Sequence, residues 1–222
     1  MSMNASYRRF SPRLFHALQR DPGFVRAVID FDPVTGHAPQ LPPRIRQMLA
    51  QLPDEMREYV AGSVLVDIQK SGLGDTFSQL AADAAKRFSD SGLDSSDVGE
   101  ILDIEKAWHG LHFLLTGTQW QPTDPPGNVV MGGKEIGDDL GYGPARFLNP
   151  NETSAAAMAL EQVSEQELEA SFNAEAFKAA DIYAGHWDDP EELQWIMDAF
   201  RRVKSYFSEA ARLSHGMLMF VT

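Results

Sequence analysis

The residue types most able to do chemistry stand in the stretch "DIEKAWHGLHFLLTG", residues 103–117, which places His109 and His112 three residues apart. If residues 101–116 form one helix, a polar stripe runs along it through Glu105, His109, His112 and Thr116. A carboxylate and two imidazoles on one face are potential zinc ligands. The usual helical pair, however, is spaced four residues apart with a glutamate between the histidines. We therefore predict no metal site in this stretch.

The same helix would carry an apolar stripe facing the core, made of Ile101, Ile104, Trp108, Leu111 and Leu115. The two histidines then lie at the border between core and solvent. Two interpretations remain open for them. Each could be a structural histidine bonded to a backbone carbonyl or a nearby acid, or each could line a polar pocket without a metal.

Motifs for other kinds of catalysis are missing. The chain contains no cysteine, which excludes disulfides, thiolate nucleophiles and cysteine-bound metals. It contains neither a G-x-S-x-G nucleophile motif nor a phosphate-binding P-loop. The run Gly132-Gly133-Lys134 lacks the strand–loop–helix frame that phosphate contact requires, so we interpret its glycines as turn residues. We predict no catalytic residue and no cofactor.

Two further segments combine aromatic and polar side chains with turn residues. "GYGPARFL" presents Tyr142 and Arg146, and "DIYAGHWDD" presents Tyr183 and Trp187. A guanidinium suits a carboxylate or phosphate ligand, although Arg146 would equally suit an internal bridge to Asp103 or Asp138. Together these segments and the histidine stretch predict a candidate pocket lined by Asp103, Lys106, Trp108, His112, Thr116, Tyr142, Arg146, Tyr183 and Trp187.

Charge is the most unusual property of the composition. The 222 residues carry a formal net charge of -13, which argues against general nucleic-acid binding. Between Glu161 and Asp198 there are eleven acids and one base, Lys178, a local net charge of -10. Such a segment would attract a basic protein partner. The alternative is a solvated helical face that keeps the protein soluble.

No segment predicts secretion or membrane insertion. The N-terminus lacks the apolar core of a signal peptide, and no apolar run approaches the ~20 residues of a membrane span. We expect a soluble, cytoplasmic protein that does not contact membranes.

The elements that must position the candidate residues are mostly helices. Strands are predicted at residues 4–10, 129–131, 145–148 and 217–222. Helical patterns dominate elsewhere, including most of residues 44–88. We therefore predict one α+β domain over residues 1–222. It would have a small mixed sheet that contains both terminal strands and is packed with several helices. A helical insertion around 44–100 would lie within a wider elaboration that spans 33–100.

Several helix boundaries can be predicted from capping residues. Ser11-Pro12 and Asp21-Pro22 have the pattern of an N-cap followed by proline in the first turn. Asn151 is predicted to cap an alanine-rich helix, and Ser164 with Glu167 has the spacing of a capping box. The last and longest helix is expected to begin at Asp189-Pro190 and to end at Gly216.

Three segments resemble the YfbM-like bacterial family, the domain of unknown function 1877. They are "DIEKAWHGLHFLLTG", "IGDDLGYGPARFL" and the chain from Asp181 to Thr222. The opening residues fit too, so the resemblance covers 1–31 and 102–222, whereas 33–100 departs in length and content. The family pattern maps onto Asp103, Lys106, Trp108, Leu111, His112, Phe113, Thr116 and Gly117.

The pattern leaves the position of His109 open, which weakens a paired role for the two histidines. The resemblance implies an α+β fold and a bacterial, intracellular protein, and it implies no established activity.

Three hypotheses about function follow. The first is a non-catalytic interaction protein that binds a basic partner such as a toxin, in the manner of an immunity protein or antitoxin. The second is a small-molecule-binding protein or enzyme with its pocket around His112 and the "GYGPAR" segment. The third is a structural domain in which the motif serves folding and Trp108 and Phe113 are core residues. We favour the first and third over an enzyme.

Overall fold

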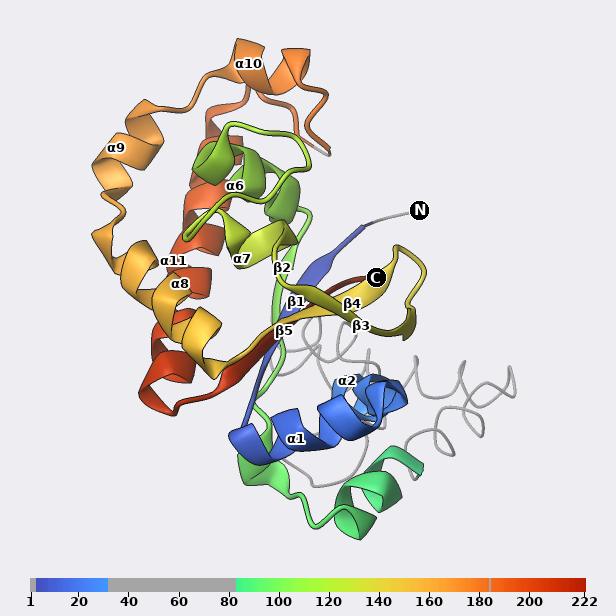
Figure 1. Ribbon diagram of the computed structural model, residues 1–222. Coiled ribbons are helices and arrows are strands. Elements are labelled where there is room, and N and C mark those ends of the chain that lie inside the picture. Colours follow the sequence, from blue (N-terminus) through green and yellow to red (C-terminus); the bar gives the residue numbers. More distant parts are fainter. Residues whose placement is uncertain (1–2, 32–82, 184) are drawn as a thin grey trace, which may run out of the picture.

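The computed structural model describes residues 3–31, 83–183 and 185–222, and its centre is a five-stranded sheet (Figure 1). The strands in spatial order are β2 (Leu102–Glu105), β1 (Ala5–Phe10), β5 (Gly216–Val221), β4 (Pro144–Leu148) and β3 (Lys134–Asp139). The α+β class is confirmed, and the two terminal strands are neighbours that pair along their whole length. Among the described residues every strand pair is antiparallel, whereas a mixed sheet was expected.

Two of the antiparallel pairings follow from the connections between the strands. β3 and β4 form a hairpin, and β5 returns alongside β1 after the longest described helix.

Helices cover both faces of the sheet (Figure 1). On one face lie α1 (Pro12–Arg20), the 3-10 turn η1 (Pro22–Phe24) and α2 (Val25–Asp30). On the other lie α6 (Ala107–Thr116), α7 (Asn128–Met131), α8 (Pro150–Gln162) and α11 (Pro190–Arg212). The chain between α8 and α11 forms α9 (Glu165–Ala170) and α10 (Ala174–Ala179). A short 3-10 turn, η2 (Ser95–Asp97), precedes β2. None of the helices in the described ranges is long and apolar enough to cross a membrane.

Alternation along the central strands creates two separate cores. In β5, Met217 and Met219 join the core under α6 and α11, while Leu218 and Phe220 join the core under α1 and α2. Because neighbouring residues of a strand face opposite sides, a strand covered on both faces is apolar at every position. This explains why the C-terminal strand is apolar without alternation.

The buried Arg8 of β1 organises the end of α2. Its guanidinium donates to the carbonyls of Val28, Ile29 and Phe31 at 2.5, 2.9 and 2.5 Å, and its Nε donates to Gly99 at 2.9 Å. The last carbonyls of a helix have no partner within the helix, so a cation at this end satisfies them.

The proposed insertion falls mostly outside the described residues, and the helices predicted between 44 and 82 cannot be compared with the structure. Residues 83–90 are helical, as the pattern indicated. Phe88 of this helix stacks on Phe31 at the end of α2, with ring centroids 4.2 Å apart. The helix at residues 83–90 therefore packs against the end of α2.

Three elements differ from prediction, and one of them is β3, whose residues 134–139 were not predicted as a strand. Residues 102–105 form strand β2 instead of the first turn of the histidine helix, which begins only at Ala107. A helical period does not reveal this strand, because its hydrogen bonds are made to β1, a distant part of the sequence. Residues 129–131, predicted as a strand, lie in α7. Val129 and Val130 are both buried on the same side of the sheet, which adjacent residues of a helix can achieve and those of a strand cannot.

The predicted caps hold at Ser11, Ser164 and Asp189, whose side chains accept from the first turns of their helices. Ser164 accepts from the N–H of Glu167 without the return bond of a full capping box. Asp21 precedes the 3-10 turn η1, and its side chain makes no cap hydrogen bond. The alanine-rich helix is capped by Asn149 rather than Asn151. The Asn149 side chain accepts from the backbone of Asn151 and Glu152, and Glu152 bonds back to the Asn149 N–H.

The end of the longest helix also differs from prediction. α11 ends at Arg212, and Ser214 takes the left-handed turn at φ 56°. Gly216 is instead the first residue of β5, where a Cβ would lie 2.4 Å from the Phe10 ring.

Candidate functional site

Helix α6 is held in place by close packing and by its tryptophan. A Cβ added to Gly110 would lie 2.7 Å from Ile196 of α11 and 3.0 Å from the ring of Trp187, so the glycine permits the close approach. Trp108 is buried, and its Nε1 donates to the carbonyl of Met3 at 3.1 Å. The motif tryptophan therefore ties the helix to the start of the chain, and its predicted core placement is confirmed.

His109 is buried and bonded on both sides of its ring. The backbone N–H of Tyr183 donates to Nδ1 at 2.9 Å, and the carbonyl of Gln119 lies 2.9 Å from Nε2. An N–H must donate and a carbonyl must accept, so Nδ1 is the acceptor and Nε2 carries the proton. Burial lowers the pKa of His109, while the Gln119 carbonyl and the nearby Asp181 oppose that shift. His109 is thus a neutral bridge between two loops.

His112 differs from His109 in the hydrogen bonding of its ring, although it is the histidine that belongs to the family motif. Its side chain is fully buried, and neither ring nitrogen has a hydrogen-bond partner within the described part of the chain. Burial and the neighbouring His109 lower its pKa to about 4. The backbone of Gln121 opposes this shift, but lies outside hydrogen-bond geometry. His112 is therefore neutral at pH 7.

The ring of His109 forms a cluster with the rings of Trp108, Trp120 and Tyr183. The His109 ring stacks on Trp108 at 4.7 Å between centroids and lies 4.5 Å from Trp120. Trp108 is also 6.1 Å from Trp120 and 6.3 Å from Tyr183. Trp120 is 44% exposed, one of the few large apolar side chains at the surface. Trp120 was not singled out from the sequence, although a tryptophan in the polar loop "TGTQWQPTDPPG" is a visible signal.

The other residues of the histidine motif shape the local chain. Asp103 is buried, and its carboxylate accepts from the N–H of Glu105 at 2.7 Å, where the backbone turns at φ 51°. Lys106 is half-buried and stands at the N-cap of α6. The hydroxyl of Thr116 donates to the carbonyl of His112 at 2.8 Å. Glu105, which the helical pattern had aligned with the histidines, is exposed at the end of β2.

The remaining candidate residues occupy other parts of the fold. Tyr142 is 39% exposed in the turn between β3 and β4. Arg146 on β4 donates to the carbonyl of Met131 at 3.1 Å and pairs with Glu135 at 3.5 Å, instead of bridging to Asp103 or Asp138. Trp187 is buried and donates to the carbonyl of Ile182 at 3.1 Å. The structure thus brings Trp108 and Tyr183 together and places Tyr142 and Arg146 on a separate hairpin.

The acidic segment runs from the end of α8 through α9 and α10 into the first half of α11. None of its eleven acids is buried. Its single base, Lys178, is bound by Glu175 at 2.9 Å and by Asp188 at 2.5 Å. The positive charge of Lys178 is therefore already neutralised. Arg201 pairs with Glu165, Glu169 and Asp198, and Lys204 pairs with Glu161. The acids still outnumber these bases, so the segment presents net negative charge to solvent.

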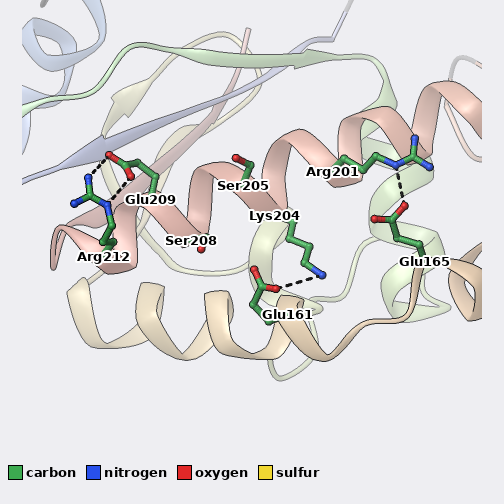
Figure 2. Close-up of a pocket in the computed structure, with 8 residues that line it drawn as sticks. All are labelled: Glu161, Glu165, Arg201, Lys204, Ser205, Ser208, Glu209 and Arg212. Carbon is green, nitrogen blue, oxygen red and sulfur yellow. Dashed lines mark hydrogen bonds and ion pairs between the residues drawn. The ribbon is translucent and has the colours of Figure 1, made fainter.

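A polar groove runs between α8 and α11, and the acidic segment contributes Glu161 and Glu165 to its lining (Figure 2). Its volume is about 600 Å³, and its lining residues are Glu161, Glu165, Arg201, Lys204, Ser205, Ser208, Glu209 and Arg212. Opposite charges within it are paired, as in Arg201 with Glu165 at 2.8 Å and Lys204 with Glu161 at 3.5 Å. Among the described residues, no three His, Cys, Asp or Glu side chains come close enough together to hold a metal ion.

These features define an α+β protein with an antiparallel sheet between two helical layers. The protein also has two buried histidines and the acidic segment. The chain belongs to the family described as "Domain of unknown function (DUF1877)", whose sequence model matches residues 1–220. It is also similar to the crystal structure of YfbM from Escherichia coli, a protein of unknown function. The sequences are 25% identical, with 55% of this chain and 82% of that chain covered at a TM-score of 0.45. None of the curated proteins matches the chain.

Proposed function

We propose that this protein is a non-catalytic interaction protein whose acidic segment binds a basic protein partner. The observation that carries the proposal is the state of the acidic segment. None of its eleven acids is buried, and they outnumber the three bases that pair with them in the described part of the chain, Lys178, Arg201 and Lys204. Clustered charge of one sign speeds the encounter with a partner of the other sign and disfavours acidic competitors.

Helix stability alone does not explain this charge distribution. Acids in a first turn are stabilised by the helix dipole, which accounts for Glu175 in α10 and Glu191 in α11. Asp181 lies beyond the C-terminal end of α10, where a helix dipole does not stabilise a carboxylate. Its exposure supports a role in recognition, and a basic toxin that this chain neutralises is the partner class we propose.

Co-expression provides the test. Basic proteins encoded beside this gene would be expressed alone to find one that is toxic, and then together with this chain. We expect the wild-type chain to restore growth. The triple variant E175Q/D188N/E191Q should lose rescue. The control D90N/E135Q/D138N removes the same number of exposed acids elsewhere and should keep it. Equal rescue by both variants, or a lack of any rescued or bound neighbour, would contradict the proposal.

A second candidate function is a small-molecule site around His112. The observation in its favour is that both ring nitrogens of His112 lack partners among the described residues, which a polar ligand would supply. Native mass spectrometry of the purified protein tests it. A retained small molecule that is lost in H112F would support a ligand site, whereas identical spectra of the two proteins would argue against it.

A further inference from the structure

We infer that Trp120, Tyr183 and Asp181 form a docking surface for an arginine or lysine side chain of the basic partner. This inference rests on the proposed function and names the point of contact. It starts from the contrast between Trp120, which is 44% exposed, and its neighbours Trp108 and His109, which are buried. A large aromatic ring left at the surface beside a buried ring cluster provides a face that a partner can cover.

His109 determines which groups surround the exposed ring of Trp120. Its Nε2 holds the Gln119 carbonyl, next to Trp120, and its Nδ1 holds the Tyr183 N–H. Two loops that are distant in sequence are thereby fixed on either side of one imidazole. Tyr183 is further held by its hydroxyl, which accepts from the backbone N–H of Met3 at 3.1 Å. The surface is therefore preorganised by partly buried hydrogen bonds, which lowers the entropy cost of binding.

The charge beside the rings selects the ligand. Asp181 is exposed and close enough to His109 to oppose the lowering of the histidine pKa. Its backbone is left-handed, at φ 50°, a conformation that few residues other than glycine adopt at low cost. Cations bind over the faces of tryptophan and tyrosine, and a neighbouring carboxylate strengthens that attraction. A guanidinium or ammonium group fits this combination, and the acidic segment that continues beyond Asp181 would attract the chain that carries it.

The variants that test the site keep the fold intact. W120A removes the exposed ring, and W120F restores a smaller ring face. D181N removes only the charge, because asparagine tolerates the left-handed backbone as aspartate does. M158A is the matched control, since Met158 of α8 is 64% exposed and belongs to neither the ring cluster nor the acidic segment. Circular dichroism would verify that each variant is folded.

Octa-arginine is the first probe, titrated at low ionic strength. We expect W120A to raise its dissociation constant about two- to fivefold, the size of a cation–π contact at the surface. W120F should recover part of the loss, D181N should weaken binding, and M158A should bind as the wild type does. Binding that is unchanged in W120A and D181N would overturn the docking surface. If E175Q/D188N/E191Q still lost affinity in that case, the proposed function would stand without it.

N-acetyl-arginine amide is the second probe. It carries a single guanidinium, so it tests binding at the ring cluster separately from binding along the rest of the acidic segment. In nitrogen-15 NMR spectra, it should shift the indole resonance of Trp120, assigned by its absence in W120F, more than those of Trp108 and Trp187. A titration without a selective shift would overturn the inference. A selective shift combined with failure of octa-arginine to bind any variant would instead remove the support for the proposed function and leave the cation site intact.

Discussion

The backbone N–H of Tyr183 donates to Nδ1 of His109 across 2.9 Å, joining residues that are 74 positions apart. On its other side the same imidazole holds the Gln119 carbonyl. Because both bonds are made by one rigid ring, the loop before α7 and the loop before α11 cannot shift independently. The histidine outside the family pattern is thus the one with a defined structural role.

Replacing His109 by leucine should destabilise the protein by about 2–5 kcal/mol, because two partly buried backbone groups would lose their partners. Urea unfolding would measure the loss. The control is H16L, which changes an exposed histidine on α1 and should alter stability little. Nitrogen-15 shifts of the wild-type ring should show the proton on Nε2. A ring protonated on Nδ1, or a stability loss no larger than that of H16L, would contradict the bridge.

Acid should weaken the fold through His112. Its pKa falls from 6.5 to about 4 on folding, so between these values the unfolded chain binds more protons than the folded one. Stability is then complete above pH 6.5 and declines as the pH falls towards 4, by about 3 kcal/mol in total. His109 adds to the slope in the same direction, because burial lowers its pKa as well.

The variant H112F separates these contributions. Phenylalanine has a similar shape and no polar atoms, so at pH 7 the variant should be about as stable as the wild type, or more stable. Its unfolding free energy should also depend less on pH between 6.5 and 4. Two results would refute this account of His112: an unchanged pH slope, or a loss of several kcal/mol at neutral pH.

Arg8 should be intolerant of lysine. The ammonium of lysine has three donors at one point, whereas the guanidinium spans four carbonyls from two segments, residues 28–31 and Gly99. We expect R8K to lower the free energy of unfolding by about 2–4 kcal/mol, since some of these buried carbonyls would be left unpaired. Denaturant titration checks the value. The exposed Arg26 offers the comparison R26K, whose effect should stay below about 0.5 kcal/mol.

The capping residue of α8 can be identified by a pair of alanine substitutions. N149A removes the side chain that accepts from two backbone N–H groups and should cost about 1 kcal/mol. N151A leaves both bonds in place, because Asn151 contributes only its backbone to them. Thermal unfolding of the two variants distinguishes them. A larger loss in N151A would mean that the cap is misassigned.

The α+β class, the strands at 4–10, 145–148 and 217–222, and the starts of α1 and α11 could be predicted from the sequence alone. Each depends on local rules: proline and a capping side chain at a helix start, or a short run of apolar residues bounded by turns. The family resemblance was also available from the motif residues, since it depends on the identity and spacing of amino acids.

Only the tertiary structure determined what the motif residues do. β2 is a strand because β1 lies beside it, and α7 is a helix because two adjacent valines must be buried on one side. The sequence places His109 and His112 on one face of one helix. Tyr183 and Gln119 nevertheless bond the ring of His109, while the ring of His112 has no hydrogen-bond partner among the described residues. Hydrogen-bond partners distant in the chain are chosen by packing, and a local pattern carries no information about them.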